Sequence, residues 1–268
     1  MRSVTLVGVP WDEQSSFMRG AAEAPVAIRR ALQSPASNLS SESGLEFGGD
    51  ALLVDAGDVS MESGEARGAI DAIASAAERA WARGAPVLAI GGDHAVTFPL
   101  VRACAGRHPA LNILHLDAHP DLYDNFEGNC FSHACPFARI MEARLAARLV
   151  QVGIRTMNAP QRRQADRFAV EVHDMRDWTG DLDVAFDGPV YISLDLDVLD
   201  PAFAPGVSHH EPGGLSVREV LRIVQRFRGR LVGADVVELN PSRDRDGVTA
   251  TVAAKFVKEL AARLVADA

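Results

Sequence analysis

Short apolar runs alternate with longer amphipathic or alanine-rich stretches along the whole chain. The apolar runs at residues 3–9, 51–54, 86–90, 111–116, 149–152, 169–172, 190–194 and 230–237 have the length of strands. Helical patterns occupy residues 25–33, 65–83, 96–105, 136–147, 159–168, 216–227 and 248–265. Such alternation favours right-handed βαβ crossovers, and continuously apolar strands favour burial on both faces. The pattern predicts an α/β protein with three layers (α/β/α), a mostly parallel central sheet, and a single domain over residues 1–268.

Composition narrows the class of protein. The hydrophobic fraction of 47% and charged fraction of 24% are ordinary for a soluble globular chain. A net charge of -9 without a long basic run predicts no nucleic-acid partner and suits a small cationic substrate. No apolar run approaches the ~20 residues that a membrane span needs. Three cysteines without a C-x-x-C pair and an N-terminal apolar run too short for a signal peptide predict a cytoplasmic protein.

Carboxylates and imidazoles follow three of the predicted strands. Asp117, His119 and Asp121 come directly after residues 111–116, and their spacing of two puts them on one side of an extended backbone. Asp195 and Asp197 follow residues 190–194, and the segment Gly91–His94 follows residues 86–90. Ligand sites in parallel sheets lie beyond the carboxyl ends of the strands, so these groups are predicted to meet. Acidic groups crowded in this way repel one another unless a cation lies between them.

Together these stretches supply two imidazoles and four carboxylates: His94, Asp117, His119, Asp121, Asp195 and Asp197. This hard donor set suits Mn²⁺, with Mg²⁺, Fe²⁺, Co²⁺ or Ni²⁺ left open, and its lack of cysteine argues against a structural zinc site. Six donors suit two ions that share bridging carboxylates and acidify a water molecule for hydrolysis. Helix caps, turns or a core histidine are the alternative readings. His115 is expected to point away from the site and pack in the fold.

Three motifs resemble the signatures of the arginase/agmatinase (ureohydrolase) family: Gly-Gly-Asp-His at 91–94, Leu-Asp-Ala-His-Pro-Asp at 116–121, and Ser-Leu-Asp-Leu-Asp-Val-Leu-Asp-Pro at 193–201. The segments at 123–129 and 206–214 resemble the plant-type arginase branch. The resemblance implies two Mn²⁺ per chain. His94 and Asp121 would bind one ion, and His119 and Asp197 the other. Asp117 and Asp195 would bridge both.

The resemblance also implies roles in catalysis. Glu238, in Val-Glu-Leu-Asn-Pro, would pair with the substrate guanidinium, which offers parallel N–H donors to a carboxylate. His133 would shuttle a proton to the leaving amine, a task suited to histidine near neutral pH, and Asp121 would relay a proton. Asn129 would face the far end of the substrate. The implied reaction is attack of a bridging hydroxide on the guanidinium carbon, releasing urea and an amine, in a homo-oligomer (trimer or hexamer).

The substrate and two other classes of protein stay open. Gly153-Ile154-Arg155 is followed by Thr156, Met157 and Asn158, without the acidic residues that help many arginases hold the substrate amino group. L-Arginine is favoured, while agmatine, guanidinobutyrate and formimino compounds remain alternatives. A deacetylase-like enzyme with a single zinc ion and a non-catalytic metal-binding homologue are the other classes. His209 and His210 fall in a loop predicted near the pocket mouth.

Overall fold

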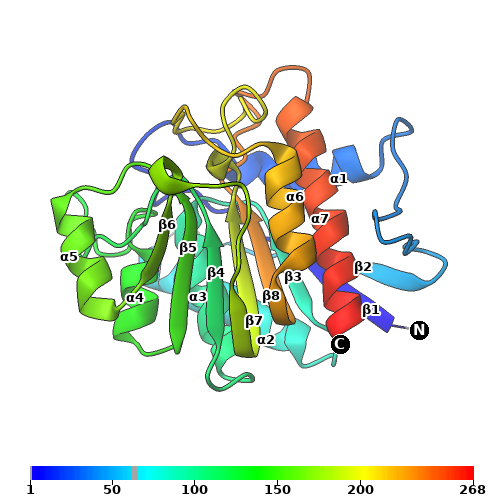
Figure 1. The fold of residues 1–268 in the computed structure, drawn as a ribbon. Coiled ribbons are helices and arrows are strands. Elements are labelled where there is room, and N and C mark those ends of the chain that lie inside the picture. Colours follow the sequence, from blue (N-terminus) through cyan, green and yellow to red (C-terminus); the bar gives the residue numbers. More distant parts are fainter. Residues whose placement is uncertain (1, 62–64) are drawn as a thin grey trace.

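Eight parallel strands form one sheet through the middle of the molecule in the computed structural model, which describes residues 2–61 and 65–268 (Figure 1). The strands are β1 (Arg2–Gly8), β2 (Ala51–Asp58), β3 (Val87–Ile90), β4 (Asn112–Leu116), β5 (Arg148–Ile154), β6 (Glu171–Asp174), β7 (Ala185–Asp195) and β8 (Arg228–Val237). Their order in the sheet is β2-β1-β3-β8-β7-β4-β5-β6. The predicted α/β class is confirmed, and every strand pair in the described part of the chain is parallel.

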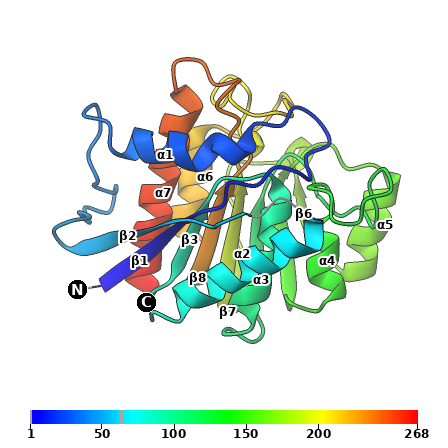
Figure 2. The same ribbon diagram turned by 180° about the vertical axis from the view of Figure 1, so that it is seen from behind.

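Helices cover both faces of the sheet. The helices are α1 (Ala24–Leu32), α2 (Ala66–Trp81), α3 (Thr97–Ala105), α4 (Pro136–Glu142), α5 (Ala159–Phe168), α6 (Val217–Arg226) and α7 (Val248–Asp267). Helices α1, α6 and α7 lie on the face seen in Figure 1, and α2, α3 and α4 lie on the opposite face seen in Figure 2. Each helical layer encloses its own buried apolar cluster against the sheet. The result is the three-layer arrangement that the sequence pattern predicts.

Several predicted boundaries are wrong, and two of them have a local backbone explanation. Helix α4 ends at Glu142, five residues before the predicted end at residue 147, and Arg144 already has φ +54°. Strand β6 begins at Glu171, two residues after the prediction, because Ala169 serves as the left-handed C-cap of α5 with φ +51°. L-residues rarely adopt this conformation inside an element, so each position ends the preceding helix.

The turn after β3 depends on one glycine. Gly92 has φ +86°, and a Cβ atom built there would lie 2.6 Å from Val96 Cγ1, 2.8 Å from the Trp11 carbonyl oxygen and 2.9 Å from that of Val9. The backbone of other segments thus approaches this turn closely. Because only glycine fits both the angle and the space, Gly92 allows β3 to pass directly into the turn that carries His94.

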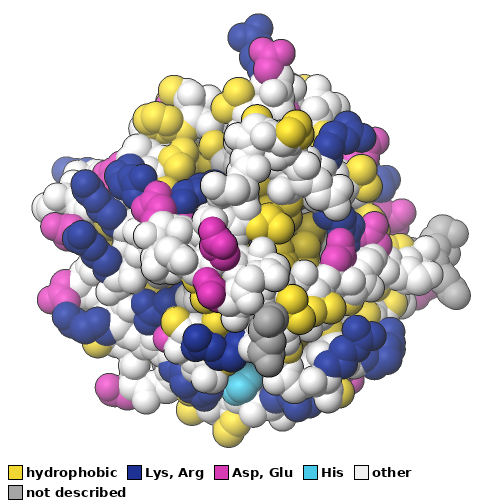
Figure 3. Space-filling model, turned by 90° about the vertical axis from the view of Figure 1, so that its right-hand side faces the viewer, with side chains coloured by type: hydrophobic (Ala, Val, Ile, Leu, Met, Phe, Trp, Pro, Cys, Tyr) yellow, Lys and Arg dark blue, Asp and Glu magenta, His cyan; other side chains and the backbone are white. Residues whose placement is uncertain are grey.

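Strand β2 is one edge of the sheet and carries the exposed apolar side chains Leu52 and Val54. Figure 3 looks at the right-hand side of Figure 1, and hydrophobic side chains are visible there between charged ones. Within residues 2–61 and 65–268, no helix has both the length and the apolar composition that crossing a bilayer requires.

Candidate active site

The four central strands β3, β8, β7 and β4 carry the site at their carboxyl ends. His94 Nδ1 lies 3.0 Å from Asp117 Oδ2, 3.1 Å from Asp121 Oδ2 and 3.1 Å from Asp195 Oδ2. Beside this group, His119 Nδ1 lies 2.9 Å from Asp197 Oδ2 and 3.4 Å from Asp117 Oδ1. All six predicted metal donors therefore come together in two adjoining groups, with Asp117 common to both.

Backbone amides hold the carboxylates in place. Asp117 Oδ1 accepts a hydrogen bond from the His119 N–H at 2.5 Å, and Asp195 Oδ1 accepts one from the Asp197 N–H at 2.8 Å. Asp197 Oδ1 accepts one from the Ala118 N–H at 3.0 Å, which ties the ends of β7 and β4 together. Each of these carboxylates keeps its other oxygen, Oδ2, directed at an imidazole.

The electrostatics of this cluster fit a cation. His94 Nδ1 is completely buried and makes no hydrogen bond, although three carboxylate oxygens surround it. Burial, together with the charges of Asp197 and Asp117, raises the pKa of Asp195 well above its usual range. Burial lowers the pKa of His119, but Asp197 and Asp117 outweigh burial and raise it to about 12. These shifts reflect crowded negative charge, which an ion bound by oxygen and imidazole donors would offset.

A buried polar network orients the His94 ring from behind. His94 Nε2 lies 3.0 Å from Ser193 Oγ, and the Ser193 hydroxyl donates to Asp235 Oδ1 at 2.7 Å. The Tyr191 hydroxyl donates to the other oxygen of Asp235 at 2.8 Å. Nε2 is thereby engaged, and Nδ1 is left free toward the carboxylates.

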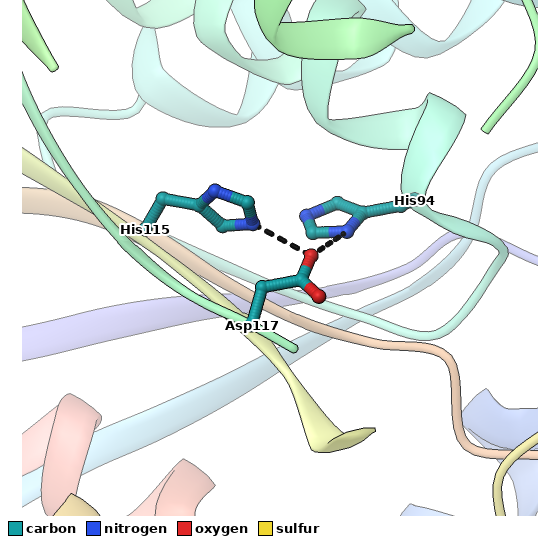
Figure 4. A group of neighbouring side chains, drawn as sticks. All are labelled: His94, His115 and Asp117. Carbon is teal, nitrogen blue, oxygen red and sulfur yellow. Dashed lines mark hydrogen bonds and ion pairs between the residues drawn. The ribbon is translucent and has the colours of Figure 1, made fainter. Parts of the chain in front are cut away.

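His115 is buried in the fold as expected, but the structure contradicts the expectation that it points away from the site, because it lies against Asp117 (Figure 4). Residues 115 and 117 differ by two positions on β4, so their side chains share one face of the strand. His115 Nε2 lies 2.7 Å from Asp117 Oδ2, and the His115 ring stacks on Phe137 with centroids 3.8 Å apart. Burial lowers the pKa of His115 below its usual value.

Glu238 and His133 form a buried pair next to the carboxylate cluster. Glu238 Oε1 accepts the His94 backbone N–H at 2.9 Å and lies 3.1 Å from His133 Nδ1. Burial lowers the pKa of His133, but the hydrogen bond and charge of Glu238 outweigh it and raise that pKa to about 9. Glu238 has φ +65° and Asp121 has φ +48°, both in the left-handed region. Two of the three predicted catalytic residues thus have strained backbones, a common property of functional sites.

A cavity of about 210 Å³ opens above this cluster. Its walls include Ser16, Tyr123, Phe126, Thr156, Gln161 and His209, together with His119, Asp121, His133, Asp195, Asp197 and Glu238. Asn129 is not part of the wall: its side-chain amide donates to Gln14 Oε1 at 2.8 Å, and its Oδ1 accepts the Phe131 N–H. His209 lies with its ring centroid 5.0 Å from that of His133, whereas His210 is bonded to the Pro205 carbonyl outside the cavity.

Arg155 holds the loop behind the cluster, a role that sequence reasoning missed. Its guanidinium donates to the backbone carbonyls of Asp197 at 2.7 Å and Glu211 at 2.6 Å. No carboxylate pairs with Arg155 among the described residues. The sequence signal for this role was the position of Arg155 at the end of Gly153-Ile154-Arg155, directly before Thr156-Met157-Asn158.

Fold and site together define an α/β protein with a buried cluster of candidate metal ligands, rich in carboxylate oxygens, at the carboxyl edge of a parallel sheet. The model of the Arginase family matches residues 2–262, and the chain belongs to this family. "Arginase 1, mitochondrial" of Arabidopsis thaliana is 48% identical over 278 residues, covering 98% of this chain and 81% of that protein. The solved structure of an arginase from Medicago truncatula superposes with a TM-score of 0.91 at 42% identity, covering 98% of this chain and 87% of that one. An agmatinase of Bacillus anthracis is 31% identical, covering 96% of this chain and 90% of that protein.

The names of the plant relatives contradict the prediction of a cytoplasmic protein. The Arabidopsis thaliana arginase is named as mitochondrial, and other plant arginases at 46–47% identity are named as mitochondrial or chloroplastic. The prediction was wrong because it depended on cysteines without a disulfide pattern. Cys104, Cys130 and Cys135 are indeed free thiols, but free thiols fit any reducing compartment and do not distinguish an organelle from the cytoplasm.

Proposed function

We propose that this protein hydrolyses the guanidinium group of L-arginine to urea and ornithine with two bound Mn²⁺ ions. The observation that carries the proposal is the position of Glu238, a buried carboxylate beside six metal-type donors at the floor of an acidic cavity. Membership of the Arginase family and the identity to plant arginases support the same reaction.

The donor groups suit two ions that share ligands. His94 and Asp121 would hold one ion, His119 and Asp197 would hold the other, and Asp117 and Asp195 would bridge them. When bound, the ions supply the Lewis acidity that brings the pKa of a water molecule toward neutrality. Burial of the carboxylates keeps competing water away and strengthens their electrostatic interactions.

Glu238 binds and orients the substrate guanidinium. Its Oε1 is fixed by His94 N–H and His133, and Oε2 accepts no hydrogen bond within the described part of the chain. The cavity wall contains no lysine or arginine among those residues, so the field inside it favours a cation. A planar guanidinium docked on Glu238 would thus hold its carbon above the carboxylate cluster.

His133 is the proton donor in this proposal. Its pKa of about 9 keeps the ring protonated near neutral pH, and its Nε2 lies 2.8 Å from Ser16 Oγ at the cavity wall. A protonated His133 between Glu238 and the cavity can deliver a proton to the departing amine as the C–N bond breaks. Asp121, also at the wall, is suited to pass a proton from the attacking water.

The far part of the cavity supports arginine over agmatine. Tyr123, Thr156 and Gln161 line it with neutral hydroxyl and amide groups. The Thr156 hydroxyl already donates to the Ala118 carbonyl at 3.2 Å, so Tyr123 and Gln161 are the donors that would bind the carboxylate of arginine. Neither of them offers a carboxylate to the second ammonium group of agmatine. Agmatine remains the alternative substrate, because an agmatinase is 31% identical to this chain.

Urea release by the Mn²⁺-treated protein tests the proposal, with arginine, agmatine, 4-guanidinobutyrate and 3-guanidinopropionate compared side by side. We expect turnover of arginine, at least 100-fold lower turnover in Asp195→Ala, and wild-type turnover in the control His173→Ala on β6, which lies outside the site. Two manganese ions per chain by elemental analysis are expected in wild type. Preferred turnover of another guanidine would change the substrate, and the absence of urea from all four would overturn the hydrolase.

A further inference from the structure

His115 has no part in the reaction proposed above, although it is fully buried and contacts a predicted bridging ligand. Strands β4 and β5 pair in a register that sets His115 directly opposite Gln151. Gln151 is also fully buried, and its Nε2 lies 2.9 Å from His115 Nδ1. A buried histidine with partners on both ring nitrogens has a defined tautomer, which these contacts identify.

The direction of each hydrogen bond follows from a backbone carbonyl. Gln151 Nε2 lies 2.7 Å from the Pro120 carbonyl oxygen, which can only accept. If the Gln151 amide were flipped, its Oε1 would face the Pro120 carbonyl oxygen, and two acceptors would be in contact. Nε2 therefore faces Pro120 and donates one hydrogen to it. Its second hydrogen is donated to His115 Nδ1. His115 Nδ1 is therefore an acceptor, and Nε2 carries the hydrogen that points to Asp117 Oδ2 at 2.7 Å.

We propose that His115 is a positioning residue of the metal centre: protonated on Nε2, it donates to Asp117 and fixes the carboxylate that would bridge the two ions. The inference rests on the metal centre of the proposed function. Because Nε2 carries a hydrogen, His115 has no lone pair there with which to bind metal. Its proximity to His94 and Asp117 therefore makes it a support and not a seventh ligand.

The supporting contacts form a closed ring around the metal-binding segment. Pro120 lies between His119 and Asp121 and is connected through Gln151 and His115 back to Asp117. With the His119 N–H on Oδ1 and His115 on Oδ2, both oxygens of Asp117 are oriented by a donor. Stacking on Phe137 holds the His115 ring in its plane. The carboxylate is thus held in one orientation before any ion binds.

Nitrogen-15 NMR of histidine-labelled, metal-free wild type tests the tautomer directly. We expect a His115 ring with a protonated Nε2 and an unprotonated, hydrogen-bonded Nδ1, with the signal assigned by its loss in His115→Phe. A ring protonated on Nδ1, or on both nitrogens, would overturn the inference. The main readout is the tautomer in wild type and does not depend on activity, and a folded His115→Phe variant is needed only to assign the signal.

Manganese affinity tests the positioning role. His115→Phe keeps a ring against Phe137 but removes the donor, so we expect its Mn²⁺ dissociation constant to rise 10- to 100-fold in a chelator competition. At saturating Mn²⁺, KM for arginine should stay within twofold of wild type, because Glu238 is untouched. His115→Gln retains an N–H donor and should recover part of the affinity. The control His173→Phe should bind Mn²⁺ as wild type does.

The two proposals fail in different ways. Equal Mn²⁺ affinity in wild type and folded His115→Phe would overturn the positioning role while leaving the hydrolase intact. A wild-type protein that binds no Mn²⁺ and releases no urea would instead remove the metal centre on which both depend.

Discussion

His133 and Glu238 are a buried acid–base pair whose charge state depends on pH. Glu238 raises the pKa of His133 from 6.5 to about 9 despite burial. A group with a raised pKa in the folded protein stabilises the fold fully below its unfolded value, and this stabilisation is lost as pH rises through the folded value. The pair therefore stabilises the metal-free protein below pH 6.5 and ceases to do so above about pH 9.

We expect His133→Asn to show this window. In EDTA, the free energy of unfolding of wild type should exceed that of the variant by about 1–3 kcal/mol at pH 6, since a buried charge-assisted hydrogen bond is lost. The difference should shrink toward zero by pH 10. Urea denaturation at several pH values measures it, and a difference that is constant with pH would contradict the assignment of the titration to His133.

Individual residues divide into those that spacing predicts and those that it does not. The convergence of the six candidate metal donors could be predicted because each follows an apolar strand, either at a spacing of two or after Gly91-Gly92-Asp93. His115 was misjudged although its parity with Asp117 was visible in the sequence. Arg155 and the Asn129–Gln14 contact depend on residues far apart in the chain, and no local pattern reports such contacts.

Among the elements, α5 connects helix capping to the cavity. Asn158 is its N-cap, and its side chain accepts the Gln161 N–H while Gln161 Oε1 accepts the Asn158 N–H. The Asn158 amide also contacts the Tyr123 hydroxyl, and both Tyr123 and Gln161 line the cavity. The first turn of α5 thus sets the position of the far cavity wall.

Asn158→Ala should separate these effects. Loss of the cap is expected to lower the free energy of unfolding by about 1 kcal/mol. Release of Tyr123 and Gln161 should raise KM for arginine several-fold with kcat within twofold of wild type. Asn158→Asp keeps the cap and should keep the stability. Denaturant titration and steady-state kinetics measure both quantities, and an unchanged KM in Asn158→Ala would contradict the role of α5 in the cavity wall.

Gly92 lies in the turn between β3 and the short 3-10 turn His94–Val96, and its conformation leads to a second prediction. Gly92→Ala adds a Cβ at a positive φ and in contact with Val96 and the backbone of Trp11 and Val9. Gly84 offers a matched control, because it has φ +87° with open space around its Cβ position. We expect Gly84→Ala to cost about 1 kcal/mol from backbone strain alone and Gly92→Ala to cost at least 2–3 kcal/mol.

Thermal or denaturant unfolding of both variants measures this difference. Metal content should also fall in Gly92→Ala, because the turn positions His94, and should be unchanged in Gly84→Ala. Equal destabilisation by the two substitutions would mean that the crowding around Gly92 relaxes without cost.

In the whole molecule, the order of strands brings the site together. Strands β3, β8, β7 and β4 are neighbours at the centre of the sheet, and the pairs β3–β8 and β7–β4 join strands that are far apart in sequence. The hydrophobic pattern predicted each strand and the edge at which their polar residues lie. It could not predict the order, because strands buried on both faces are interchangeable in composition. The motif resemblance supplied the assignment of the donors to two ions, which the hydrophobic pattern could not provide. A homo-oligomer stays a prediction, which light scattering in solution would test.

The loop between α1 and β2 is fastened to the opposite end of the chain. Glu42 pairs with Arg218 at 2.7 Å and contacts Gln225 and Lys255, and its backbone N–H donates to the buried Glu259. Hydrogen bonds from Arg218 and Gln225 lower the pKa of Glu42 to about 2. The stabilisation is present above pH 4.5 and is lost as pH falls toward 2.

Glu42→Gln should loosen this loop with little effect on global stability. We expect a loss of less than about 1 kcal/mol, because the pair is partly exposed. Chymotrypsin cleavage near Leu45 and Phe47 should become several-fold faster at pH 7, whereas the exposed control Glu127→Gln should leave cleavage unchanged. Equal cleavage in wild type and Glu42→Gln would show that other contacts hold the loop.

The left-handed backbone at Glu238 also bears on how such a site evolves. Glycine would relieve the strain at this position, so Glu238→Gly removes the proposed substrate anchor with little strain cost to the fold. Random mutation therefore has a one-step route from an active protein to an inactive one, in which the relieved backbone strain offsets part of the stabilisation lost with the His133–Glu238 pair. The reverse path demands a strained carboxylate that brings no benefit until the metal ligands are in place. Lineages that retain Glu238 would do so under continuous selection for turnover, and inactive descendants should arise far more readily than new active ones.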